Sequence, residues 1–297
     1  MHSQIEDQST LEQDARLDDP LRRVAFEAGM LLGLEAVRDE QQYHRRRLNR
    51  QQYWLHGYGT LAGMRVGMLP ESHPDPDADT RVRLVVWPGI GIDGLGREIL
   101  VHEAYCIELR EWLTAQSSTA LAEGFDAGAG RLWLKVCIRH KDCALARQPV
   151  LARKLNLSTD AVQPSRHADS VDIELLPELP PPSPADDAYQ PWACHGETGP
   201  MPPLNAFEQD TLDSASGAAA AQLRLHARLL HALDGGVATR DLAGEFHDGA
   251  RVLLARVAIE ASDIDAVIVN PNRISINNLV RPFVVSASQL AWLARQG

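Results

Sequence analysis

A long helical segment that ends in a glycine turn constrains this chain more than any other feature. Residues spaced by three or four positions share one helix face: Leu34, Val37, Gln41, His44, Leu48, Gln51 and Leu55. This face is only partly apolar, so we expect the helix to lie across a sheet or against a neighbouring subunit. Gly57 stands where a left-handed cap falls, because glycine has no Cβ to clash at positive φ.

Short segments rich in β-branched residues predict a sheet after this helix. The pattern favours strands after Gly59 and at 81–87, 90–92, 97–101, 132–138, 251–260 and 266–270, with helices at 107–113, 205–233 and 287–295. Because the strands are short and lack a βαβ rhythm, we predict an α+β fold. Its sheet is expected to be mainly antiparallel, or a small barrel, with a long N-terminal helix and a C-terminal helix.

Proline density divides the chain. Nine of its 18 prolines lie between 177 and 203, and proline is excluded from helix interiors and central strands. We therefore expect little regular structure from 141 to 203. The predicted organisation is a mobile arm (1–18), a helix plus β-rich body (19–176), a proline-rich linker (177–204), and a helix and strands completing the same body (205–297).

Charge and hydropathy exclude some functions. The net charge is −11, with 29 basic and 40 acidic residues, which argues against binding a phosphate backbone. The arginine cluster at 45–50 is interpreted as a solvated or subunit-facing helix surface. We predict no membrane span, since no run of roughly 18 apolar residues occurs. The polar N-terminus lacks signal-peptide features, so we expect a cytoplasmic location, or release in assembled particles.

Two loop motifs resemble ligand-binding sequences. Gly89–Gly94 matches G-x-G-x-x-G, but β-forming residues follow where a dinucleotide site needs a helix, so a hairpin at Asp93-Gly94 is favoured. Residues 75–79 place aspartates at the first, third and fifth positions of a calcium loop. The sixth and twelfth positions are Thr80 and Val86, so a solvated acidic loop is the better interpretation.

A group of cysteines and histidines offers candidate metal ligands. Cys137, His140 and Cys143 have close spacing, and Cys194 or His195 could complete a tetrahedral zinc site. The alternative is that Cys137 is a buried free thiol in an apolar strand. An enzyme or metal-binding module built on this group is one hypothesis.

Other sequence features carry little chemistry. A glycan-binding hypothesis rests on Trp87 and Trp192. No G-x-S-x-G, H-E-x-x-H or P-loop string occurs, and His56 has no evident catalytic partner. We therefore predict no catalytic residue and no cofactor.

The long helix and the first strands also carry a family resemblance. Glu40-Gln41, Tyr43, Arg45 to Arg47, Asn49-Arg50, His56 to Gly59 and Gly63 to Val66 form one part of the pattern, and Trp87 to Asp93 with Gly96 to Ile99 continue it. This pattern resembles a little-characterised bacterial family found beside phage-tail-like contractile injection and prophage tail genes. The resemblance implies a structural role without catalysis.

The favoured hypothesis is therefore an adaptor that acts by protein–protein assembly. Its expected partners are other particle proteins and further copies of the chain, with no nucleic acid. The predicted interface lies on the long helix and comprises Gln41, Tyr43, His44, Arg46, Arg47, Asn49 and Arg50.

Overall fold

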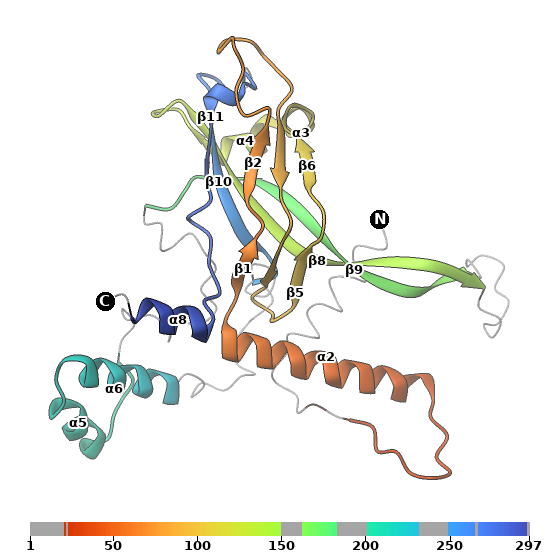
Figure 1. Ribbon diagram of the computed structural model, residues 1–297, viewed down its shortest axis with the longest axis vertical. Coiled ribbons are helices and arrows are strands. Elements are labelled where there is room, and N and C mark those ends of the chain that lie inside the picture. Colours follow the sequence, from red (N-terminus) through yellow and green to blue (C-terminus); the bar gives the residue numbers. More distant parts are fainter. Residues whose placement is uncertain are drawn as a thin grey trace. The chain divides into compact units, whose positions relative to one another are not determined.

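Antiparallel strands in three open sheets make up most of the protein. The computed structural model describes residues 21, 23–149, 162–182, 201–231, 249–264 and 267–295. The strands are β1 (Gly59–Gly63), β2 (Val66–Leu69), β3 (Arg83–Val86), β4 (Gly89–Ile92), β5 (Glu98–Val101), β6 (Tyr105–Glu108), β7 (Phe125–Asp126), β8 (Arg131–Pro149), β9 (Val162–Pro177), β10 (Val252–Glu260) and β11 (Ile274–Asn277) (Figure 1).

The described helices fall into two compact units. The strands belong to the larger unit, together with α2 (Leu34–His56), α3 (Leu109–Ala115), α4 (Ser118–Ala122), the short 3₁₀ helix η3 (Pro271–Arg273) and α8 (Ala287–Leu293). The smaller unit contains α5 (Ala206–Asp213) and α6 (Gly217–Leu230).

Three bent segments build the first two sheets. One sheet has the order β1-β4-β5 and the other β2-β3-β6. The chain passes from one sheet to the other between β1 and β2, between β3 and β4, and between β5 and β6. At the first bend Met64 has a φ of 52°, and its amide donates to the Pro88 carbonyl at 3.1 Å. This hydrogen bond joins the bend between β1 and β2 to the bend between β3 and β4, so the strands on either side of the bends remain paired.

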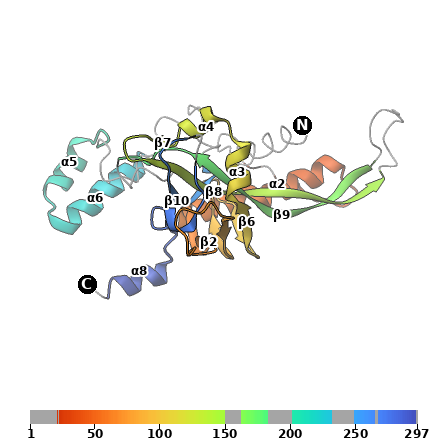
Figure 2. The same cartoon turned by 90° about the horizontal axis from the view of Figure 1, so that it is seen from above.

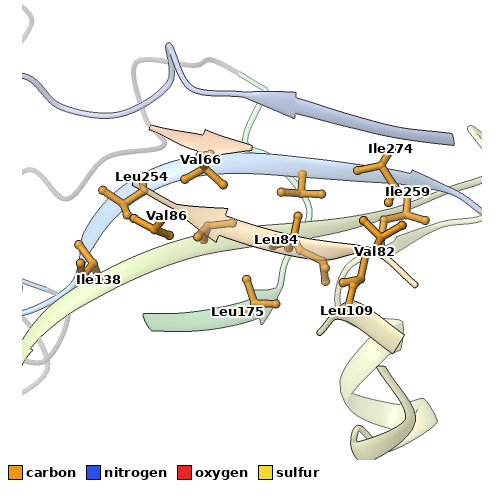
Figure 3. Packing of buried hydrophobic residues seen from close by; sticks show 14 of the residues in the cluster. Val66, Val82, Leu84, Val86, Leu109, Ile138, Leu175, Leu254, Ile259 and Ile274 are labelled. Carbon is orange, nitrogen blue, oxygen red and sulfur yellow. The ribbon is translucent and has the colours of Figure 1, made fainter. Parts of the chain in front are cut away.

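The third sheet supplies the centre of the core. Its order is β11-β10-β8-β7, with β9 also paired to β8. Eight successive residues of β10, from Val252 to Ile259, are buried, as in a strand covered on both faces. Figure 3 shows Leu254 and Ile259 of β10 packed with residues from β2, β3, β8 and β9 in one hydrophobic cluster. The predicted strand at 132–138 lies here, and its four alternating apolar residues are buried as expected.

A long two-stranded ribbon corrects the expectation of little regular structure after residue 141. β8 continues to Pro149 and pairs with β9 from Leu134↔Pro177 to Pro149↔Val162. Beyond Ile138, β8 no longer pairs with β10, so β9 is its only partner strand among the described residues (Figures 1 and 2). The ribbon was missed because its distal residues are polar and largely exposed. Its register comes from backbone hydrogen bonds between segments far apart in sequence.

Several predicted boundaries also change. The helix expected at 205–233 is two helices separated at Ser214–Ser216, and α5 begins with a capping box between Asn205 and Glu208. Residues 267–270 form no strand, and η3 and β11 follow them. The C-terminal helix is present, with Ser286 accepting from the Gln289 amide as its N-cap.

The α+β class and the antiparallel sheets are confirmed, whereas none of the described sheets closes into a barrel. Among the described helices, none has the length and apolar character needed to cross a bilayer. Residues 178–182 and 201–204 of the predicted linker have no regular structure. The predicted arm at 1–18 lies outside the described residues.

Candidate interaction surface

Helix α2 has the bounds that its sequence predicts. Gly33 occupies the N-cap in extended conformation, and Gly57 follows the last turn at a φ of 74°. The Gly57 amide donates to the Tyr53 carbonyl at 2.8 Å. At this combination of φ and a ψ of −152° only glycine is comfortable, so the sequence sets where α2 ends.

The semi-polar face of α2 is exposed along its whole length. The side chains of Leu34, Val37, Leu48 and Leu55 are 66%, 49%, 54% and 67% exposed, and Gln41, His44 and Gln51 are exposed with them. No described segment covers this face. Large apolar side chains at this exposure on one helix face are typical of a surface that another protein buries.

The opposite face of α2 turns toward the protein's own body. Asn49 is only 8% exposed, whereas Tyr43, Arg46 and Arg50 are half-buried. The other predicted interface residues, Gln41, His44 and Arg47, are exposed. The structure therefore divides the predicted interface set between the two sides of the helix, and Asn49 faces the protein's own body.

One close contact fixes α2 to the loop between β4 and β5. Gly96 has a φ of 79°, and a Cβ added there would lie 1.9 Å from the Asn49 carbonyl oxygen. A residue with a side chain would thus push the helix away. This requirement for glycine joins the long helix to the hairpin that follows it in the sequence.

A buried ion pair holds the loop that contacts α2. The Asp93 carboxylate is fully buried and accepts from the Leu95 and Arg97 amides, both at 2.9 Å. Its second oxygen accepts from Arg97 Nε at 2.7 Å and forms an ion pair with Nη2 at 2.6 Å. The Gly89–Gly94 motif is therefore a β-hairpin, as predicted, and its Asp93 carboxylate forms an ion pair with Arg97.

Polar contacts along α2 order the flank of the exposed face. Glu40 accepts from the Val24 amide at 3.0 Å and lies 3.0 Å from the His44 ring. One turn further on, the Arg47 guanidinium donates to the Tyr43 hydroxyl at 2.9 Å. These interactions stay within the helix or the segment before it, so they leave the apolar positions open.

Strand geometry separates the candidate zinc ligands. Side chains alternate along a strand, so Cys137 and His140 of β8 point to opposite faces. Cys137 and Cys143 share a face, but six residues of strand place them about 20 Å apart, too far for one zinc ion. Cys194 and His195 lie outside the described residues. Burial raises the pKa of Cys137 to about 12, which makes it a buried neutral thiol.

His140 instead belongs to a charged group on the β8–β9 ribbon. Its Nε2 lies 3.1 Å from Asp142 and 3.9 Å from Asp169, and its Nδ1 lies 3.3 Å from the Glu98 carbonyl oxygen. Among the described residues, the side chains of His140, Asp142 and Asp169 are close enough to share a metal ion. Burial lowers the pKa of His140, but the Asp142 carboxylate outweighs it and raises the pKa above 6.5. The geometry is that of an ion pair between neighbouring side chains.

The acidic loop at 75–79 is tied to a distant part of the chain. Asn270 donates to the Asp75 and Ala78 carbonyls at 2.9 and 2.7 Å. Two of its carboxylates pair with Arg110 and Arg273. The loop therefore has a structural role: Asp77 and Asp79 pair with arginines, and the Asp75 carboxylate accepts from the Asp77 amide.

Trp87 and Arg281 are two further residues with cationic or buried polar contacts. The Trp87 ring is covered by the Arg65 guanidinium at 4.1 Å, and Trp192 lies outside the described residues. Sequence reasoning missed Arg281, which is 5% exposed and donates to the Met64 carbonyl at 2.8 Å. Burial lowers the pKa of Arg281 to about 10. Its Nε also donates to the nearby Asn278 carbonyl, but no local pattern marks Arg281, because Met64 lies more than two hundred residues away in the sequence.

Comparison with known proteins adds no relative to this picture. No family model matches the chain, and no curated protein is similar to it.

Proposed function

We propose that this protein is a non-catalytic adaptor of a phage-tail-like or contractile injection particle, and that it docks through the exposed face of α2. The observation that carries the proposal is this face, with four large apolar side chains about half exposed or more on a helix of 23 residues. Burying them against a partner would remove apolar surface from water, which stabilises an interface.

The α2 docking site lies on a helix whose opposite side contacts the β4–β5 loop. The buried Asp93–Arg97 pair and the Gly96 contact hold the opposite side of the helix. A fixed helix binds with a smaller loss of conformational entropy than a mobile one. The ribbon of β8 and β9 supports the same function, since a two-stranded hairpin is marginally stable alone and gains from a partner.

The chemistry at the other candidate positions favours assembly over catalysis. The cysteine thiol in β8 is buried and neutral, and the acidic loop is bound to arginines. The resemblance to tail-associated proteins supplies the kind of particle.

Incorporation into particles tests the proposal. Particles are sedimented from lysates of cells that carry the gene in its own genomic setting, and the chain is detected with an antibody. We expect it in the particle fraction, and we expect Leu48→Glu to remove it. The control is Leu290→Glu, because Leu290 is 56% exposed on α8, close to the 54% of Leu48. Particles that form fully and never contain the wild-type chain would contradict the proposal.

A further inference from the structure

We propose that the exposed face of α2 binds a second copy of the same chain, with the two helices parallel and in register. This inference rests on the proposed function, because it names one partner of the same surface. It starts from the spacing of the exposed residues, which alternates between three and four over seven positions, from Leu34 to Leu55. That is the a/d pattern of a two-stranded coiled coil over three heptads.

The body of each copy leaves room for the other. With Leu34 at an a position, buried Asn49 and half-buried Tyr43, Arg46 and Arg50 fall at b, c, f and c. Glu40 and Gln52, at the flanking g and e positions, are half-buried as well. The b, c and f positions lie on the side of the helix opposite the a/d seam. The sheets contact this side through Gly96. Pairing of two α2 helices therefore places both bodies on the outside.

The order of apolar and polar residues selects the parallel arrangement. In a parallel pair each layer joins a residue to its own copy, so Leu34, Val37, Leu48 and Leu55 meet apolar partners. Gln41, His44 and Gln51 then meet polar ones, which can hydrogen-bond across the seam. An antiparallel pair sets a residues against d residues. Its two central alignments place Leu34 against Gln51, or Leu48 against His44, and bury polar groups against leucine.

Charges on the flanks agree with the parallel arrangement. Glu40 is at a g position and Arg45 is at the e position five residues later, so each copy's Glu40 faces the other's Arg45 in a parallel pair. In an antiparallel pair, e residues face e residues and g residues face g residues. One central alignment then sets Arg38 against Arg45 and Glu40 against Arg47, so its attraction and repulsion offset. The other sets Arg45 and Arg47 each against its own copy, so only like charges meet.

The mass of the full-length chain tests whether the pair forms. Light scattering after size-exclusion chromatography, over a series of protein concentrations, should give twice the chain mass of 32.7 kDa at the upper end of the series. Leu48→Glu should return it to the monomer, while Leu290→Glu should not. Circular dichroism checks that both variants keep their helix content. A monomer at every concentration, a trimer, or a dimer unaffected by Leu48→Glu would overturn the proposal.

Disulfide trapping tests the orientation. In a background of Cys106→Ser, Cys143→Ser and Cys194→Ser, with buried Cys137 retained, Val37→Cys and Leu55→Cys are oxidised separately and together. A parallel pair forms a covalent dimer from each variant alone. Covalent dimers only in the mixture would show an antiparallel pair and overturn the inference.

The two proposals fail separately. A monomeric chain that still enters particles overturns the dimer and leaves the adaptor function standing. A dimer that is absent from particles overturns the adaptor function and leaves the dimer standing.

Discussion

The carbonyl oxygen of Asn49 lies where a side chain on Gly96 would have to be, 1.9 Å from the position of its Cβ. One residue belongs to helix α2 and the other to the loop after β4, almost fifty positions later in the chain. The contact places this side of α2 against the body of the protein, and the opposite side is left exposed.

We predict that Gly96→Ala destabilises the protein and loosens α2. The substitution combines an unfavourable φ of 79° with a backbone clash, and we expect a loss of roughly 2–5 kcal/mol in the free energy of unfolding. The matched control is Gly130→Ala, which has a φ of 62° but meets only the Ala261 oxygen at 3.6 Å. It should cost about 1–2 kcal/mol. Urea denaturation measures both, and equal losses would show that the contact is unimportant.

Removing the Asp93 carboxylate should be costly because it leaves the Arg97 charge buried. For Asp93→Ala we expect a loss of about 3–5 kcal/mol in unfolding free energy. The double variant Asp93→Ala with Arg97→Met should lose less than the single one, since no buried charge remains unpaired. For comparison, Glu111→Gln removes an exposed partner of Arg81 and should change stability by less than about 1 kcal/mol. A double variant with a lower free energy of unfolding than Asp93→Ala would contradict this account.

The His140–Asp142 pair should stabilise the ribbon over a limited pH range. The folded pKa of His140 is raised above 6.5, so its contribution is complete below that value and is lost as pH rises through the folded pKa. The hydrogen bond to His140 lowers the pKa of Asp142 below 3.8, so this contribution is lost only in stronger acid. The pair thus contributes most between the two ordinary values.

His140→Gln should therefore cost more stability at about pH 5 than at about pH 8.5. Both residues are partly exposed, so the difference should stay below about 1 kcal/mol. Parallel urea titrations of wild type and variant at the two pH values measure it. A larger cost at the higher pH would mean that the histidine acts as a neutral group.

Cys137 should resist alkylation in the folded protein. Its side chain is 1% exposed and its pKa is raised to about 12, so almost no thiolate is present at neutral pH. Cys106 is exposed and should react with iodoacetamide first. Peptide mapping by mass spectrometry reads both sites, with urea-unfolded protein as the control in which both react. Modification of Cys137 as fast as Cys106 would contradict the burial.

Much of the local structure could be predicted from neighbouring residues. The bounds of α2 follow from its residue spacing and from Gly33 and Gly57, the hairpin follows from Asp93-Gly94, and the last helix follows from its Ser286 cap. Each of these signals depends on residues close together in the chain, so it can be recognised from the sequence alone.

The ribbon and the buried Arg281 could not be predicted in this way. The distal half of β8 is polar, and its pairing with β9 depends on hydrogen bonds across a separation that no local pattern encodes. For Arg281, burial is possible only because Met64 and Asn278 supply carbonyl acceptors near it in space.

The candidate surface shows the same division. The sequence alone placed seven residues on one face of a helix, because a helix repeats every 3.6 residues. Whether that face would be buried or exposed depended on the opposite face, where Asn49 meets Gly96. A contact between distant segments is a property of the folded chain, so only the tertiary structure could decide that the leucines of α2 face outward.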